Sequence, residues 1–247
     1  MNVVVIIPAR FGSTRFQAKP LMEISGKPMI QHVYERAALA PTASSVVVAT
    51  DDRRIFNVVE QFGGTALMTS DKNRSGTDRV GEAAELLKME MEDIVVNVQG
   101  DQPLLHPKCI EDLVHPFAVD HQVKMTTLAY KIRDESEITN PKDVKVTFNK
   151  RRDALYFSRS PIPCGRDDGQ KFDVFKHLGL YAYTRRFLER FRAMPSGPLE
   201  QIEKLEQLRA LEHGFAIRVV VTEFDSPEVD IPEDVKRIER RLYEGSI

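Results

Sequence analysis

The residues N-V-V-V-I-I at 2–7, followed by Pro8, open a repeating pattern of short apolar runs and amphipathic segments. Two further runs, S-V-V-V-A-T at 45–50 and I-V-V-N-V at 94–98, have the same character. Short and largely apolar runs are typical of strands that are covered on both faces, as in a parallel sheet. The pattern therefore predicts three buried parallel strands in the first hundred residues.

The segments between these runs have the spacing of helices. Residues 28–39 are amphipathic, residues 54–62 end at two glycines, and a third helix is expected over 78–89. This β-α-β-α-β order predicts an α/β fold in which helices flank a mainly parallel sheet through right-handed crossovers.

The second half of the chain has a different pattern. Four strand candidates follow with little helix between them, at 123–132, 144–148, 154–158 and 178–183. We expect them to add an antiparallel portion, or an arm that projects from the main sheet. The whole chain, 1–247, is interpreted as one domain in which about 123–185 form a subsidiary lobe.

Two helices and one loop are expected near the end of the chain. The first helix covers about 199–213, with an apolar stripe that runs from Ile202 to Leu211. The second begins at Pro232, whose two following acidic residues suit the positive end of a helix dipole. The segment G-R-D-D-G-Q at 165–170 is the best loop candidate.

Composition excludes several classes of protein. The 247 residues include 35 Lys+Arg and 37 Asp+Glu, and this net charge of −2 argues against a general nucleic-acid binder. The longest apolar opening, 3–7, is far too short to insert in a membrane, and the first residues do not resemble a secretory signal. Cys109 and Cys164 are too few for a disulfide framework or a zinc site. We expect a soluble, cytoplasmic globular protein.

Three segments follow predicted strands and are expected to share one crevice, because ligands of open parallel sheets bind outside the carboxyl ends of the strands. They are 8–19, 51–52 and 99–103. The first contains Arg10, Arg15 and Lys19, and its charge predicts a grip for phosphate groups. It is neither a Walker loop nor a dinucleotide fingerprint. The alternative is an ordinary solvated basic loop.

Acidic residues suggest a metal site. Asp101 follows the strand at 94–98, and a carboxylate there could hold Mg²⁺ against phosphate oxygens. Asp230 could supply a second ligand, although it could equally be the N-cap of the helix that begins at Pro232. The segment S-G-T-D-R at 75–79 is either a helix cap or a place where a base approaches the backbone.

Nine sequence blocks occur in an order that resembles the 3-deoxy-manno-octulosonate cytidylyltransferase (CMP-Kdo synthetase) family over essentially the whole chain. They are P-A-R-F-G-S-T-R-x₃-K-P-L (8–21), G-K-P-M-I-Q-H-V (26–33), V-A-T-D-D (48–52), S-G-T-D-R (75–79), N-V-Q-G-D-Q-P (97–103), L-Y-F-S-R-S-P-I-P (155–163), K-H-L-G-L-Y-A-Y (176–183), L-E-Q-L-R-A-L (205–211) and V-D-I-P-E-D (229–234). Each block alone is weak, but nine in series are specific.

The resemblance implies roles for particular residues. Triphosphate binding falls to Arg10, Ser13, Arg15 and Lys19, of which Arg10, Arg15 and Lys19 also act in catalysis together with Asp101. Cytidine binding falls to Ser75, Gly76, Asp78 and Arg79. Sugar binding falls to Gln99, Arg159, His177, Tyr181, Glu206 and Gln207. Magnesium binding falls to Asp101 and Asp230. For Glu206 a local ion pair with Arg209, and for Tyr181 an ordinary strand position, are equally compatible with the sequence.

The implied reaction is CTP + 3-deoxy-D-manno-octulosonate (Kdo) → CMP-Kdo + pyrophosphate, which activates the sugar for lipopolysaccharide synthesis. The implied fold is the Rossmann-like nucleotide-diphospho-sugar transferase fold, with an arm that forms a homodimer. The implied partners are CTP, a sugar acid and Mg²⁺, with no nucleic acid. A nicotinamide-dependent oxidoreductase would need the missing glycine fingerprint, and a non-catalytic nucleotide-binding module would not need both aspartates.

Two departures from the family pattern concern the choice of sugar. Residues 16–18 are F-Q-A where the family usually has L-P-G, and Glu223, Asp225 and Glu228 add acids before the last aspartate. Both resemble a branch that acts on 8-amino-3,8-dideoxy-manno-octulosonate. The 8-hydroxy sugar is expected first, the 8-amino sugar is the alternative, and another sugar acid such as sialic acid is less favoured.

Overall fold

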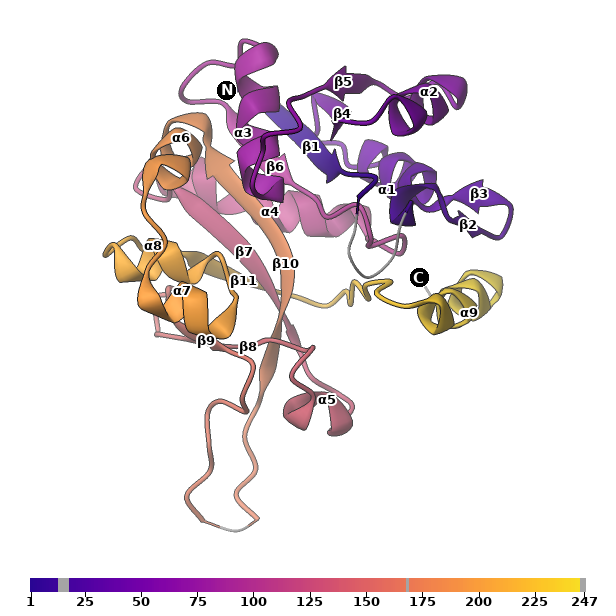
Figure 1. The fold of residues 1–247 in the computed structure, drawn as a ribbon. Coiled ribbons are helices and arrows are strands. Elements are labelled where there is room, and N and C mark those ends of the chain that lie inside the picture. Colours follow the sequence, from indigo (N-terminus) through magenta and orange to yellow (C-terminus); the bar gives the residue numbers. More distant parts are fainter. Residues whose placement is uncertain (13–17, 168, 245–247) are drawn as a thin grey trace.

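The computed structural model describes residues 1–12, 18–167 and 169–244, and a twisted sheet runs through its centre (Figure 1). The strands are β1 (Val3–Ala9), β2 (Glu23–Ile24), β3 (Lys27–Pro28), β4 (Ser45–Thr50), β5 (Ala66–Met68), β6 (Ile94–Asn97), β7 (Met125–Lys131), β8 (Lys145–Phe148), β9 (Ala154–Ser158), β10 (Phe175–Thr184) and β11 (Arg218–Thr222). The helices are η1 (Lys19–Leu21, a 3-10 helix), α1 (Met29–Ala38), α2 (Arg53–Gln61), α3 (Gly76–Leu86), α4 (Pro107–Val119), α5 (Ser136–Thr139), α6 (Arg185–Ala193), α7 (Pro198–Glu203), α8 (Leu208–Glu212) and α9 (Pro232–Tyr243).

The strand order of the main sheet is β11-β7-β10-β6-β1-β4-β5. Strand β1 pairs in parallel with β4 and with β6, and β11 pairs in parallel with β7. Strand β10 is antiparallel to both of its neighbours, β6 and β7. The predicted α/β fold with a mainly parallel sheet and flanking helices is therefore confirmed, and β10 contributes the antiparallel portion expected in the second half.

Two apolar layers cover the sheet because the side chains of β1 alternate between its faces. Val3, Val5 and Ile7 pack with residues of α1, α2 and α4 on one face. Val4 and Ile6 pack with residues of α3, α6 and α8 on the other. Burial on both faces explains why the strand is a continuous apolar run rather than an alternating one.

Several predicted boundaries differ from those of the structure, and two of the differences have a clear physical reason. Strand β1 continues through Pro8 to Ala9, because its ladder to β6 ends at Ile6 and a residue without an amide hydrogen is tolerated beyond that point. The single helix expected over 199–213 is two short helices, because Lys204 adopts a left-handed conformation (φ 55°) that ends α7. Ile202, expected in the apolar stripe, is 77% exposed.

A hairpin and a loop project from the lower end of the sheet (Figure 1). Strands β8 and β9 pair in antiparallel fashion, and β8 contacts β10 through Lys145 and Lys176. Residues 159–167 then lead away from the molecule, and residues 169–174 lead back to β10. The projecting part is smaller than the lobe expected over 123–185, because β7 and most of β10 lie within the main sheet.

The last helix, α9, lies beside the β2–β3 hairpin near the start of the chain (Figure 1). Ile24 and Met29 form a small apolar cluster with Val229 and Ile238, and all four side chains are fully buried. This contact holds the segment before α9 next to the loops that follow β1 and β6. In the part of the chain that the structure describes, no helix has the length and apolar character needed to cross a membrane.

Candidate active site

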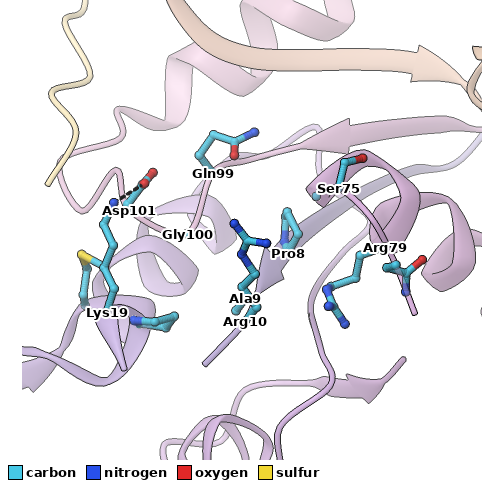
Figure 2. A pocket seen from close by; sticks show the side chains of 13 residues that line it. Pro8, Ala9, Arg10, Lys19, Ser75, Arg79, Gln99, Gly100 and Asp101 are labelled. Carbon is cyan, nitrogen blue, oxygen red and sulfur yellow. Dashed lines mark hydrogen bonds and ion pairs between the residues drawn. The ribbon is translucent and has the colours of Figure 1, made fainter. Parts of the chain in front are cut away.

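A pocket of about 270 Å³ opens where the loops after β1 and β6 diverge (Figure 2). Strands β1 and β6 are neighbours, but the chain between them first visits β4 and β5 on the other side of β1. This reversal of strand order is where ligands of open α/β sheets bind. The lining includes predicted residues from three segments: Arg10, Lys19, Ser75, Gly76, Arg79, Gln99 and Asp101.

Lys19 lies between the two aspartates that were predicted to bind metal. Its Nζ is 2.6 Å from Oδ2 of Asp101 and 3.4 Å from Oδ1 of Asp230. Burial lowers the pKa of Lys19, but the two carboxylates more than offset this effect, so the pKa is raised above its ordinary value. The ammonium group therefore stays charged and neutralises part of the acidic pair.

The neighbouring backbone keeps the Asp230 carboxylate available to the site. The N-cap of α9 is Ile231, and the side chain of Asp234 accepts hydrogen bonds from the amides of Asp230 and Ile231. Asp230 is therefore not the N-cap, which was the alternative that the sequence left open. The amide of Val229 donates to the carbonyl of Asp101 at 3.0 Å and ties the two segments together.

The aspartate pair fits a magnesium ion. Oδ1 of Asp101 is buried and has no hydrogen-bond partner among the described residues, so one carboxylate oxygen is left for a ligand. Among residues 1–12, 18–167 and 169–244, no three His, Cys, Asp or Glu side chains cluster closely enough to hold a metal ion by themselves. Magnesium commonly takes one or two protein carboxylates and fills its other positions with phosphate oxygens and water.

The start of α3 borders the pocket of about 270 Å³, and a side chain caps this end of the helix. Ser75 accepts a hydrogen bond from the amide of Asp78 at 3.1 Å, so it is an N-cap and also lines the pocket. Arg79 is 3% exposed and bonds Oδ2 of Asp51 at 2.6 Å and Oγ1 of Thr69 at 2.6 Å. Asp78 does not line this pocket, because its carboxylate faces Arg74 and Arg192.

The basic loop after β1 is described at both of its ends. Arg10 is exposed at the pocket, and the amide of Ala18 bonds the carbonyl of Phe11 at 3.1 Å, which closes the loop. The ring of Phe11 lies 3.3 Å below the guanidinium of Arg54, and this cation–π contact anchors the start of the loop. Two predicted residues of the loop, Ser13 and Arg15, lie outside the described residues.

A second, larger cavity of about 600 Å³ adjoins the first, and Gln99 and Asp101 line both. All six residues that were predicted to bind the sugar line this cavity: Gln99, Arg159, His177, Tyr181, Glu206 and Gln207. They come from the loop after β6, the residue after β9, strand β10 and the segment between α7 and α8. Fold topology therefore brings together residues that are more than one hundred positions apart in the sequence.

The hydrogen bonds of His177 fix its tautomer. Oγ1 of Thr127 donates to the carbonyl of Leu180 at 2.7 Å and lies 2.8 Å from Nε2 of His177. A hydroxyl has one proton, so Thr127 accepts from His177 and Nε2 carries the hydrogen. Nδ1 is then an acceptor that is suited to a sugar hydroxyl. Burial lowers the pKa of His177 to about 3, so the ring is neutral.

Two other sugar-side residues have specific partners. Tyr181 donates from its hydroxyl to Oε1 of Gln207 at 3.1 Å, and Nε2 of Gln207 is buried with no partner among the described residues. Arg159 donates to the carbonyl oxygens of Glu203, Pro141 and Lys204, at 2.7, 3.0 and 3.5 Å. Because a guanidinium has five N–H donors, two remain for a ligand.

Further residues of the larger cavity were not predicted as sugar-binding residues. Lys142 and Lys204 line it and add positive charge opposite any anionic ligand. Neither stands in a recognisable motif, so nothing in the sequence could have identified them. Glu228, one of the extra acids, also lines the cavity. Burial and the carboxylates of Asp101 and Asp230 raise the pKa of Glu228 to about 8.

Gly179 shapes the wall between these groups. It adopts φ +69° at a register shift in β10, a conformation that favours glycine, and its carbonyl accepts a hydrogen bond from Nε2 of Gln99 at 3.2 Å. A β-carbon at this position would lie 3.4 Å from Oε1 of Glu228. The positive φ and the nearby Glu228 side chain therefore explain why glycine occupies this position of K-H-L-G-L-Y-A-Y.

Comparison with known proteins gives a consistent result. The family model described as "Cytidylyltransferase" matches residues 4–223. A 3-deoxy-manno-octulosonate cytidylyltransferase of Desulfatibacillum aliphaticivorans is 61% identical over 98% of this chain and 99% of its own. An 8-amino-3,8-dideoxy-manno-octulosonate cytidylyltransferase of Shewanella amazonensis is 54% identical over 98% of this chain and 99% of its own.

The solved structure of a CMP:2-keto-3-deoxy-manno-octonic acid synthetase complexed with CTP is also similar. Its TM-score is 0.93 at 42% identity, and the match covers 99% of this chain and 100% of that chain. Family model, sequence relatives and solved structure agree over nearly the full length. The chain therefore belongs to the cytidylyltransferase family, and within it to the CMP-Kdo synthetases.

Proposed function

We propose that this enzyme catalyses CTP + Kdo → CMP-Kdo + pyrophosphate, a magnesium-dependent nucleotidyl transfer that activates the sugar for lipopolysaccharide synthesis. The observation that carries the proposal is the junction of two pockets at Gln99 and Asp101, with Lys19 beside it. One pocket lies at the basic loop and suits a triphosphate. The other contains hydrogen-bonding and basic groups that suit a sugar acid. Because CTP is a cytoplasmic metabolite, we place the reaction in the cytoplasm.

The residues of the smaller pocket neutralise and orient the nucleotide. Arg10 and Lys19 supply positive charge for the triphosphate and the departing pyrophosphate, and the family pattern adds Ser13 and Arg15 from the same loop. Ser75 and Gly76 border the opposite side of this pocket, where the cytidine would lie, and Arg79 lines the same pocket with its amide bonded to the carbonyl of Ser75. Asp78 would act only indirectly, through the conformation of the first turn of α3.

Asp101 and Asp230 would hold the magnesium ion. When bound there, the ion would supply Lewis-acid stabilisation of the phosphate charge. The chain's own contribution is to keep both carboxylates at one place through the backbone bond from Val229 to Asp101, while Lys19 occupies and partly neutralises them in the absence of the ion. Phosphates and water would complete the coordination.

The residues of the larger pocket hold the sugar for in-line attack by its anomeric hydroxyl on the α-phosphorus. Arg159, with two N–H groups left, is the proposed partner of the sugar carboxylate. Nδ1 of His177 would accept a hydrogen bond from one sugar hydroxyl, and Nε2 of Gln207 would donate a hydrogen bond to another. Tyr181 orients Gln207. Positioning and charge neutralisation supply most of the catalysis, so no covalent intermediate is required.

The 8-amino sugar is the second candidate substrate. Glu228 adds a carboxyl group to the sugar cavity, and an ammonium group beside it would favour the charged form that its raised pKa disfavours in the empty cavity. Relatives that carry either substrate in their names are more than 50% identical to this chain. The higher identity of the Kdo enzyme, 61% against 54%, keeps Kdo first.

Pyrophosphate release tests these proposals directly. The purified enzyme is given CTP and Mg²⁺ together with Kdo, 8-amino-Kdo or sialic acid in separate assays, and omission of the sugar is the control. Release with Kdo supports the proposed function. A preference for 8-amino-Kdo or for sialic acid in kcat/KM would overturn only the choice of sugar. No release with any of the three sugars would refute the enzyme assignment.

We also propose that the projecting part of the chain forms a homodimer. Strand β9 pairs with β8 alone among the described strands, and its Leu155 is 61% exposed. Phe172 lies 42% exposed in the projecting segment. Light scattering should find a dimer for the wild type and a monomer for Leu155→Asp. The matched control is Ile202→Asp at a site 77% exposed on α7, which should remain dimeric. A Leu155→Asp dimer of unchanged stability would refute this interface.

A further inference from the structure

Thr77 has a hydrogen bond that joins the two pockets. It lies in the first turn of α3, next to Gly76 and two residues beyond Ser75, both of which line the nucleotide pocket. Its side chain is buried, with 4% of the residue exposed. The hydroxyl Oγ1 donates to Oε2 of Glu206, which is 129 positions away in the sequence and lines the sugar pocket.

Glu206 depends on this contact because little else holds it in place. It lies in the irregular turn between α7 and α8, just after Lys204 ends α7 in a left-handed conformation. Its carboxylate also lies near the guanidinium of Arg209, whose Nη2 is 3.6 Å from Oε1. That guanidinium is already engaged by Glu200, with bonds of 2.8 and 2.5 Å. Thr77 is therefore the closer and better aligned partner of the Glu206 carboxylate.

A buried tyrosine of the sheet lies near Thr77. Tyr183 on β10 is 1% exposed, and the side chains of Thr77 and Asn97 are close enough to lower the pKa of its hydroxyl. Burial raises the pKa of Tyr183 well above its ordinary value, so the hydroxyl keeps its proton. Oδ1 of Asn97 also accepts from Nε2 of Gln99 at 3.4 Å. The fold thus places two polar contacts, Thr77 with Glu206 and Asn97 with Gln99, on either side of Tyr183.

We propose that Thr77 is a positioning residue that sets the orientation of the Glu206 carboxylate for binding of the sugar. This inference rests on the proposed function, because it assigns the larger cavity to the sugar. The role differs from that of a simple helix cap, since Ser75 already caps α3 through the amide of Asp78. It also differs from core packing, since the contact is made by the hydroxyl alone.

The experiment compares Thr77→Val, Thr77→Ser and Thr77→Ala in steady-state kinetics with CTP and Kdo. Valine keeps the shape of threonine and removes the donor, whereas serine keeps the donor. Loss of one hydrogen bond to a carboxylate is expected to raise KM for the sugar by about tenfold in the valine variant. The KM for CTP should stay within a factor of about 2, and serine should restore the sugar KM.

A double-mutant cycle decides whether Thr77 acts through Glu206. Thr77→Val added to Glu206→Ala should raise the sugar KM no further than Glu206→Ala alone. Independent, multiplying effects would refute the inference, and so would an unchanged sugar KM in the valine variant. If the valine variant does not fold, Thr77→Ala carries the same comparison without an added methyl group. Absence of turnover in the wild type would instead refute the proposed function, so the two failures are distinguishable.

Discussion

Replacing His177 by glutamine tests the conclusion that this ring is neutral and buried in the folded enzyme. Burial lowers its pKa from the ordinary value of 6.5 to about 3. The ring is packed against Phe157 and Tyr181, with centroid distances of 5.0 and 5.3 Å, and Nε2 bonds Thr127. Glutamine can donate to the same hydroxyl but does not titrate. Any difference in the pH dependence of unfolding between the two proteins therefore comes from protonation of His177.

The sign and size of the effect follow from the two pKa values. Between pH 3 and 6.5 the unfolded histidine binds a proton that the folded one does not, so acid stabilises the unfolded state. The slope approaches about 1.4 kcal/mol for each pH unit. Between pH 6.5 and 4.5 this proton should therefore lower the free energy of unfolding by about 2 kcal/mol in the wild type only.

Urea denaturation at pH 6.5, 5.5 and 4.5 measures the difference. The chain has no tryptophan, so unfolding is best followed by far-ultraviolet circular dichroism. Carboxylates titrate in both proteins, and subtraction of the glutamine curve from the wild-type curve removes their contribution. The two proteins should diverge as the pH falls. Parallel curves would refute the reasoning, because they would mean that the folded ring takes up a proton as easily as the unfolded one.

Three further substitutions test the site. Asp101→Asn should reduce kcat by about 10²-fold or more and leave the circular dichroism spectrum unchanged, and retained activity would remove Asp101 from the metal site. Lys19→Met should slow turnover yet tighten the binding of Mn²⁺ alone, measured by electron paramagnetic resonance, because the ammonium no longer competes for the carboxylates of Asp101 and Asp230. Unchanged or weaker Mn²⁺ binding would contradict this competition. Gly179→Ala should lower the free energy of unfolding by about 1–2 kcal/mol because alanine is strained at φ +69°, and denaturant midpoints equal to wild type would contradict that strain.

The sequence was most informative where composition alone determines structure. The β-branched run at 45–50 became β4 with the same bounds, because a strand buried on both faces needs little beyond apolar side chains. The run at 94–98 ended one residue early, at Asn97, where β6 meets the pocket. Loops after such strands could be placed at one edge of the sheet before any coordinates were known, and Asp101 lies there.

Backbone conformations that depend on distant contacts could not be predicted. Lys204 is in the left-handed region although lysine has no preference for it, so helical periodicity over 199–213 concealed the break. The choice between metal ligand and N-cap for Asp230 depended on Asp234, which took over the amide bonds. Neighbouring groups that compete for the same partner are not visible in a one-dimensional pattern.

The bond between Lys19 and Asp230 also has a consequence for biosynthesis. It spans 211 positions of the chain, so the acidic pair comes together only after residue 230 has been synthesised. Contacts of such high sequence separation are slow to form, because the closure entropy of the intervening loop must be overcome first. A nascent chain that still lacks residue 230 would contain the basic loop and Asp101, yet only one of the two proposed metal ligands. The two proposed metal ligands would therefore meet only after the segment around Asp230 has been synthesised and can reach Lys19.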